Sequence, residues 1–397
     1  MRRFCGILRT TMSRRPSRSS SVLSRSQRGR ETRRALIGFL RYVLIRSIAV
    51  GITVVVGVYL AIWISNLGGV ADQWHKDAIS EMVLLGLRGP AYSDLSTEEF
   101  RELVDATVEA AYAAHGFDRS FVHRSFQYLA EALSLSFGDT RVGGALGVPM
   151  RAGMTGSTEV RDIILEPLPR TVLLFCTATL LSLLLSLFGS LFLTRRYGNL
   201  IDRLSTLLIP VFAAPPWLHG VVLIVLFASV LRILPYGGVV DAPPPDGTFA
   251  YLLSVLKHMI LPVMAWVLAT LPMTLYANRA FFLIHSKEDY VELARAKGLR
   301  VGRIQRRYLL RPVLPAIITQ FTLTLIASWQ GAILVETVFG WPGIGSLLYE
   351  AVYRNQVPVV IGTVTVFALL LGISVIALDV VYALVDPRVR IGGGRKR

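Results

Sequence analysis

The 397-residue chain is 53% hydrophobic and 17% charged, with a mean hydropathy of +0.54. This composition excludes an ordinary water-soluble globular protein and is typical of a membrane protein. The formal net charge of +16 lies mainly in loops that flank apolar segments, so we expect no nucleic-acid partner despite the basic balance.

The N-terminal segment is rich in arginine and serine and poor in apolar residues. We predict a disordered, basic tail over residues 1–40, followed by a first transmembrane helix within residues 41–67. A basic stretch before an apolar run can also mark a signal peptide, but this run is too long and lacks a clear small-x-small cleavage site. Met1 and Met12 are both candidate start residues.

Six segments are long and apolar enough to cross about 30 Å of hydrocarbon as helices. The predicted spans are Ser47–Leu67, Thr171–Thr194, Leu204–Leu231, His258–Asn278, Val313–Val335 and Pro358–Ala377. Any one of them could instead be a buried core helix, but six such runs in one chain favour an all-α protein with six transmembrane helices.

Lysine and arginine gather in four regions: before the first span, after the second, after the fourth and after the sixth. The short loop Pro235–Leu256 contains neither residue. Because basic loops stay on the cytoplasmic side, the alternation predicts a multi-pass protein of the cell membrane with both termini in the cytoplasm. Residues 387–397 then form a basic cytoplasmic tail.

Residues 68–170 form the one large polar insertion, and we predict that it is α-helical and extracytoplasmic. Between Asp72 and Arg170 it carries fifteen Asp and Glu against nine Lys and Arg. Ser96 and Glu99 form a capping box for a helix that ends near Gly116, and a second helix is expected over Arg119–Ser136. We expect a helical cap over the outer mouth of the protein.

The segment Glu288–Gly298 is too polar to enter a membrane and too short to be a domain. Ser286 and Asp289 form an S-x-x-D start signal, and Gly298 is a stop signal, for a helix of about three turns. The alternative interpretation is an ordinary cytoplasmic loop helix.

Ala294 and Gly298 are four residues apart, so their bare surfaces share one face of this helix. Arg295 and Lys297 flank that face. Such a surface suits docking on another protein.

Several polar residues lie inside or at the ends of the predicted spans, where they are functional candidates. They are His219, Gln320, Gln330, Glu336 and Asp379. Gln320 and Gln330 are candidates to line a pathway. The alternative role for both side chains is hydrogen bonding to a neighbouring helix. Asp379 could pair with Arg388 or its neighbours.

The sequence lacks the motifs of the common nucleotide-binding and hydrolytic sites. No G-x-x-x-x-G-K-[ST] is present, so the chain is not expected to hold nucleotide phosphates itself. No H-E-x-x-H or G-x-S-x-G occurs, and the six histidines show no ligand spacing. Cys5 lies in the tail and Cys176 in the second span, so we predict no disulfide and no metal site. From the missing catalytic motifs we predict no enzymatic activity.

Three segments together resemble one transporter family. Asp289–Leu299, with Arg303, Ile304, Leu310, Arg311, Leu314 and Pro315 behind it, resembles the coupling loop ("EAA" loop) of ABC-transporter permeases. The spacing from Gly298 to Pro315 is similar to that of the binding-protein-dependent dipeptide and oligopeptide importers. Val335–Gly345 resembles that family's ETxFxxPGxG segment, and Asp379–Arg390 its C-terminal signature. The resemblance runs over residues 118–390.

The resemblance implies a permease core over residues 171–386, with five transmembrane helices and a coupling loop at residues 286–312. It implies two ATP-binding subunits, a second permease subunit, with a different chain favoured over a copy of this one, and an extracytoplasmic solute-binding protein. ATP would be bound by the partners, so this chain would need no cofactor. The implied coupling residues are Asp289, Glu292, Ala294, Ala296, Gly298, Leu314 and Pro315.

Di- and oligopeptides are the default substrates of the family, while nickel complexes, oligosaccharides and peptide-like antibiotics are carried by relatives. The chain departs from the family after the first span, where Ser65–Gly69 replaces a Pro-Gly-Asp-Pro-like motif. An ion-coupled secondary transporter or a channel subunit is the competing hypothesis. A secondary transporter more often shows repeated halves, and no internal repeat is found in this sequence.

Overall fold

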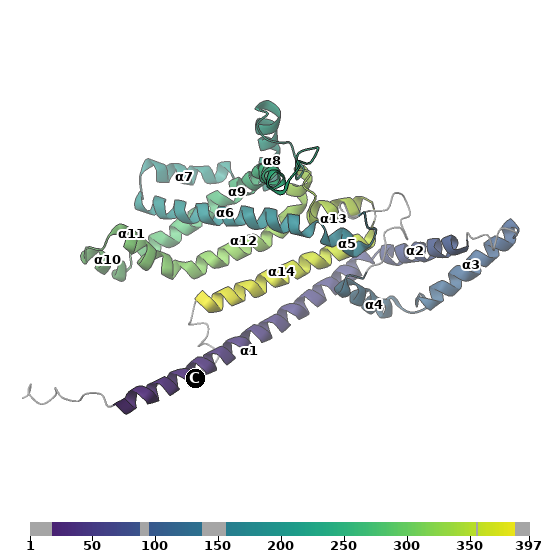
Figure 1. Cartoon of the computed structure of the whole chain (residues 1–397), viewed down its shortest axis with the longest axis horizontal. Helices are drawn as coiled ribbons and strands as arrows, with labels where there is room; N and C mark the ends of the chain where they lie inside the picture. Colours follow the sequence, from purple (N-terminus) through teal and green to yellow (C-terminus); the bar gives the residue numbers. More distant parts are fainter. Residues whose placement is uncertain (1–17, 88–94, 137–155, 355, 386–397) are drawn as a thin grey trace, which may run out of the picture.

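The computed structural model describes residues 18–87, 95–136, 156–354 and 356–385, and the regular elements of these ranges are helices. Most of them run along one bundle, with the helices of the predicted insertion at one end (Figure 1). Predictions that concern Cys5, Met12, Arg388 and the tail 387–397 fall outside the described residues.

Five long apolar helices confirm five of the six predicted spans. They are α1 (Arg18–Ser65), α6 (Leu168–Arg195), α9 (Thr248–Ser286), α12 (Leu310–Val338) and α14 (Val357–Val385). Each carries a stretch long and apolar enough to cross a membrane, which in α1 is Leu40–Ser65.

Helix α1 begins well before its apolar part. The disorder predicted for residues 1–40 is therefore wrong from Arg18 onward, since residues 18–40 continue the membrane helix. Arginine is a good helix former, and extending an existing helix costs far less than starting one. The first 17 residues lie outside the description.

The third predicted span, Leu204–Leu231, is not one helix. It consists of α7 (Leu200–Val211) and a second arm, α8 (Pro216–Leu223) with the π-helical turn η2 (Ile224–Val230), and the two arms are bent by 97°. Residues 212–215 form the break; Pro215 is the N-cap of α8 and Pro216 its first residue. Proline lacks the backbone N–H and disfavours helical geometry in the residue before it, so this pair can begin a new helix but cannot continue α7 into it.

Helices α6, α9 and α12 surround the largest buried core. Phe175 of α6 meets Trp266 of α9 edge to face, with ring centroids 5.2 Å apart. Helices α14 and α1 lie side by side along one flank of the bundle (Figure 1). An ion pair joins them, because Arg46 Nε lies 2.6 Å from Asp379 Oδ2. Among the described residues, the ion-pair partner of Asp379 is thus Arg46 on α1.

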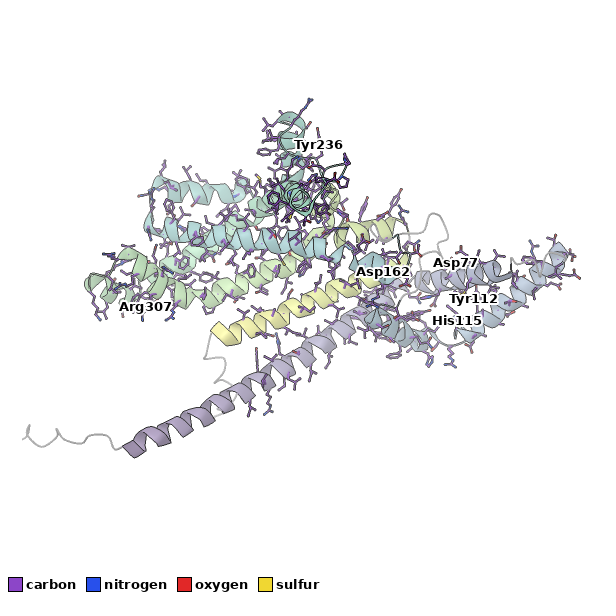
Figure 2. The ribbon with its side chains drawn as sticks, viewed as in Figure 1. Asp77, Tyr112, His115, Asp162, Tyr236 and Arg307 are labelled. Carbon is purple, nitrogen blue, oxygen red and sulfur yellow. The ribbon has the colours of Figure 1, made fainter. Side chains whose placement is uncertain are left out.

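The insertion contains α2 (Val70–Leu87), α3 (Thr97–Ala114) and α4 (Phe121–Ser134). Helices α3 and α4 confirm the two predicted ones, and Ser96 with Glu99 forms the expected capping box. Helix α2 was not predicted. Figure 2 places Asp77, Tyr112 and His115 at the end of the molecule opposite Arg307.

A polar cluster ties α2 to α4. Arg124 Nη2 lies 2.5 Å from Asp72 Oδ2, and the Tyr128 hydroxyl donates to Asp72 Oδ1 at 3.1 Å. His75 stacks on Tyr128 with ring centroids 4.5 Å apart. Burial lowers the pKa of His75 to about 4, so the imidazole is neutral at pH 7 and does not compete with Arg124 for Asp72.

At the same end of the bundle, Glu336 of α12 connects three elements and is fully buried. Its Oε2 accepts hydrogen bonds from the backbone N–H groups of Gly345 and Ser346, at 2.7 and 3.0 Å. These donors lie in the first turn of α13 (Ile344–Tyr353), where a helix leaves N–H groups unpaired. Its Oε1 accepts from Thr171 Oγ1 of α6 at 2.6 Å. Glu336 therefore caps α13 and fastens α12 to α6.

The turn between α12 and α13 depends on close backbone approach. A Cβ at Gly343 would collide with the Glu336 carboxylate, and one at Gly345 would lie 2.6 Å from the backbone nitrogen of Ile333. Trp341 is fully buried and donates from Nε1 to the Arg170 carbonyl at 3.3 Å. The ETxFxxPGxG-like segment is thus a packed joint between helices.

We predict that Glu336→Gln destabilises the protein by about 1–3 kcal/mol, because the new amide N–H₂ faces groups that are themselves donors. The measurement is thermal unfolding of the purified full-length chain in detergent. Glu350→Gln is the matched control: Glu350 is half exposed and pairs with Arg354 at the end of the same helix, which is worth well under about 1 kcal/mol. Equal shifts in the two variants would contradict the capping role.

Candidate functional site

The polar loop between α9 and α12 contains the helix expected from the sequence, with a different start. Helix α10 (Asp289–Ala296) follows Glu288, which has extended backbone geometry. Ser286 is the last residue of α9, and its hydroxyl donates to the Leu283 carbonyl at 2.8 Å. The predicted S-x-x-D start is therefore wrong, because Ser286 is used to end the preceding helix, and α10 is about two turns long.

The end of α10 confirms the predicted stop at Gly298. Gly298 has φ +71°, its N–H donates to the Arg295 carbonyl at 2.9 Å, and Leu299 N–H reaches the Ala294 carbonyl at 3.3 Å. This pair of bonds is the Schellman arrangement, which favours glycine at the left-handed position. A Cβ at Gly298 would meet nothing within 4 Å, so the backbone angle explains the glycine.

One face of α10 is buried in the chain itself. Val291 is fully buried and Ala294 is 2% exposed. They pack in a cluster with Phe282 of α9, Leu309, and Val313 of α12. The expectation that Ala294 shares a bare docking face with Gly298 is therefore wrong, because Ala294 packs α10 against the helical bundle. Its small side chain suits this close packing.

The opposite face of α10 is the part open to another protein. Leu293 is 56% exposed and Tyr290 is 37% exposed, so an apolar patch lies on a helix in a polar loop. Four of the predicted coupling residues lie on the exposed surface of this segment: Asp289, Glu292, Ala296 and Gly298.

The other two predicted coupling residues, Leu314 and Pro315, lie inside α12 and are half-buried. Pro315 is therefore part of the membrane helix and does not separate it from the loop. Transmembrane helices accommodate proline because neighbouring groups satisfy the freed carbonyl. The loop ahead of α12 contains α10 and the short helix α11 (Val301–Ile304).

A residue that the sequence did not single out fixes the loop to α6. Gln305, in the π-helical turn η3 (Gln305–Leu309), is 6% exposed. Its Nε2 donates to the Leu191 carbonyl at 3.1 Å, and its Oε1 accepts from Arg195. A single glutamine in a polar loop carries no pattern that could have identified this role.

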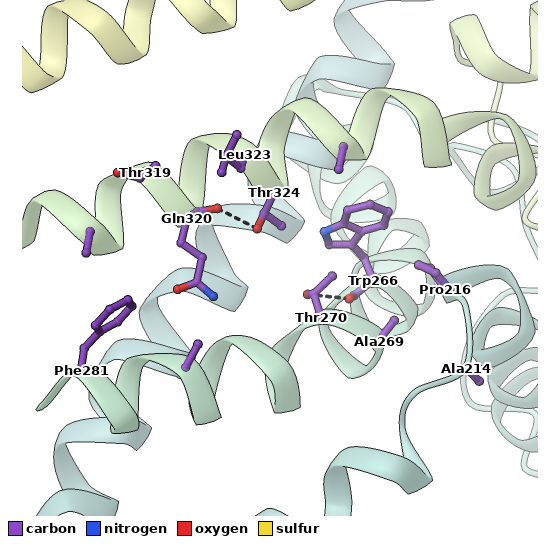
Figure 3. A pocket seen from close by; sticks show the side chains of 13 residues that line it. Ala214, Pro216, Trp266, Ala269, Thr270, Phe281, Thr319, Gln320, Leu323 and Thr324 are labelled. Carbon is purple, nitrogen blue, oxygen red and sulfur yellow. Dashed lines mark hydrogen bonds between the residues drawn. The ribbon is translucent and has the colours of Figure 1, made fainter. Parts of the chain in front are cut away.

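A groove of about 990 Å³ lies along α9 and α12, with the break between α7 and α8 at one end (Figure 3). Small residues predominate in its wall, and none of the lining residues is charged. They are Ala214, Pro216, Trp266, Ala269, Thr270, Ala277, Phe281, Ala316, Thr319, Gln320, Leu323, Thr324 and Ala327. This volume is at the upper end of small-molecule sites.

Gln320 lies in the groove wall beside Thr319 and Thr324 (Figure 3). Its Oε1 is buried and has no hydrogen-bond partner among the described residues; the same holds for Thr179 Oγ1 and Asn278 Oδ1, behind the groove. The carbonyl of Gln320 is thus not committed to a neighbouring described helix. The side chain of Gln330 lies outside the description.

The chain was compared with known proteins. Residues 170–391 match the family described as "Binding-protein-dependent transport system inner membrane component". The oligopeptide transport system permease protein AppB of Bacillus subtilis is 33% identical over 58% of this chain and 72% of its own length. The di/tripeptide transport system permease protein DppB of Pseudomonas aeruginosa is 32% identical over 56% of this chain and 70% of its own length.

A third relative, the probable D,D-dipeptide transport system permease protein DdpB of Escherichia coli, is 31% identical over 73% of this chain and 86% of its own length. The family match favours an ABC importer over a secondary transporter or a channel. Five long apolar helices and the bent pair α7–α8 agree with a multi-pass membrane protein. The chain therefore belongs to the binding-protein-dependent inner membrane component family, as a permease subunit of an ABC importer.

Proposed function

We propose that this chain forms half of a pathway for peptides. ATP-binding partner subunits would drive its conformational change through contacts with α10. The partners would be two ATP-binding subunits, a second and different permease subunit, and an extracytoplasmic solute-binding protein. The relatives are named for oligopeptides, di- and tripeptides and D,D-dipeptides, which supports di- or oligopeptides as the substrate. The sequence has no phosphate-binding loop, so ATP is bound and hydrolysed by the partners.

The observation that carries the proposal is the two-sided nature of α10. Val291 and Ala294 fasten its inner face to the ends of α9 and α12, while Leu293 projects from the outer face. Because α9 and α12 are also the helices along the groove, a force applied at Leu293 reaches the groove wall through packed side chains. Gln305 extends this connection to α6.

The groove is the proposed wall of the pathway. Its lining has no charged residue and so does not select peptides by the sign of their charge, which suits a carrier of varied peptides. Gln320 offers an amide donor and an amide acceptor, the same pair that a peptide backbone presents. Gln330 remains a second candidate on the same helix.

The distribution of charge supports a cell-membrane protein with cytoplasmic termini. Arg307, in the basic loop that contains α10, lies at one end of the bundle, and Asp77 of the acidic insertion lies at the other (Figure 2). Basic residues favour the cytoplasmic side. The ATP-binding subunits would then meet α10 in the cytoplasm, and the solute-binding protein would meet the insertion outside.

We predict that Leu293→Ser weakens attachment of the ATP-binding subunits about ten-fold, which is the typical loss for an apolar interface centre. Substrate-stimulated ATP hydrolysis should fall with it. The measurement is the affinity and ATPase rate of the complex reconstituted with its partner subunits. Ile284→Ser is the matched control, because Ile284 is 60% exposed at the same end of α9. Unchanged affinity and ATPase rate for Leu293→Ser would contradict the role of α10.

We predict that Thr319→Trp abolishes most peptide uptake in proteoliposomes, because the indole fills the groove, while the ATP-binding subunits still attach. Thr337→Trp on the same helix is the control, since Thr337 is exposed and outside the groove. Uptake that survives Thr319→Trp as well as it survives Thr337→Trp would show that peptides pass elsewhere.

A further inference from the structure

A second cavity, of about 520 Å³, opens beside the turn between α6 and α7. It is lined by Tyr197, Gly198, Asp202, Arg203, Leu207 and Arg279. It lies apart from the groove of Figure 3 and shares no lining residue with it. Neither α10 nor the pathway uses these residues.

The depth of the cavity in the membrane follows from the charges on two helices. In α9 the residues between Lys257 and Arg279 are uncharged, a stretch about 32 Å long. In α6 the residues between Arg170 and Arg195 are uncharged as well. Because the hydrocarbon layer is about 30 Å thick, Arg279 and Arg195 lie at the level of the lipid headgroups. Both are at the α10 end of the bundle.

The cavity is positively charged at this level. Arg279 donates hydrogen bonds from Nε and Nη2 to the buried carboxylate of Asp202, and Nη2 lies 2.6 Å from Oδ2. This pairing holds the guanidinium in place, and its Nη1 makes no hydrogen bond to any described residue, so the Nη1 hydrogens can bind another acceptor. Arg203 is exposed at the same cavity and makes no ion pair with any described residue. The lining thus holds two arginines, Arg203 and Arg279, against one aspartate.

Apolar side chains continue from the cavity along α7. Leu207 is 64% exposed, Leu204 is 50% exposed and Leu200 is 74% exposed. Tyr197 is 63% exposed and lies beside Arg279, whose Cζ is 5.4 Å from the ring centroid. An exposed tyrosine at headgroup depth is typical of a membrane interface. The ligand that matches arginines next to leucines is both anionic and apolar.

We propose that this cavity binds the headgroup of an anionic phospholipid. Arg203 and the free Nη1 of Arg279 bind the phosphate, Tyr197 lies beside the headgroup, and the acyl chains run along the leucines of α7. Arginine suits this role because its planar guanidinium matches phosphate oxygens. Inorganic phosphate offers the same charge without the acyl chains. The proposal goes beyond the peptide-import function and does not depend on it.

The test uses the full-length chain in nanodiscs of pure phosphatidylcholine or of phosphatidylcholine with 30% phosphatidylglycerol. The readouts are the apparent melting temperature and the bound phosphatidylglycerol seen by native mass spectrometry. Arg203→Gln removes one charge from the cavity. Arg41→Gln is the matched control, since Arg41 is an exposed arginine near the basic end of α1. A third arm adds 10 mM inorganic phosphate to the pure phosphatidylcholine discs.

Phosphatidylglycerol should stabilise the native chain and Arg41→Gln equally, whereas Arg203→Gln should bind it about five-fold more weakly, as expected for one arginine at a membrane surface. Equal losses in Arg203→Gln and Arg41→Gln would mean diffuse attraction and would overturn the site. Equal stabilisation by inorganic phosphate would assign the cavity to a free anion. If the chain shows no preference for phosphatidylglycerol, the proposal is refuted, and the exposed face of α7 is then a contact surface for another protein chain.

Discussion

The packing of α10 against the bundle is the interaction on which the rest of the structure depends. Val291 and Ala294 bury one face of a two-turn helix that is too short to be stable alone. Burying a valine contributes about 1.5–3 kcal/mol, enough to hold the helix in one orientation. Leu293 is thereby presented outward, and any movement of α10 must carry the ends of α9 and α12 with it.

At the other end of the bundle, Glu336 provides the complementary constraint. A buried carboxylate is tolerated only where donors surround it, and here Thr171, Gly345 and Ser346 supply them. The groove wall is therefore held at both ends, by apolar packing at α10 and by a hydrogen-bonded cap at α13. Such a wall transmits a displacement as a body, because close-packed interiors deform little.

Hydropathy and charge were sufficient to predict five membrane helices, because long apolar runs bounded by arginine rarely occur outside membrane spans. Hydropathy and charge did not predict the bend at Pro215, because averaging hydropathy over a window does not detect a break in the helix. The stop at Gly298 was predictable from backbone chemistry. The burial of Ala294 was not, because a small residue fits equally well against its own chain or a partner. Gln305 and Glu336 act through groups distant in sequence, which only the fold brings together.

The central claim is that the outer face of α10 receives the ATP-binding subunit. Cross-linking from a cysteine at position 293 in the assembled complex tests it most directly, with position 284 as the equally exposed reference. The account predicts a product joining this chain to an ATP-binding subunit from position 293, and little or none from position 284. A product from position 284 alone, or none from either in a complex that hydrolyses ATP, would contradict it.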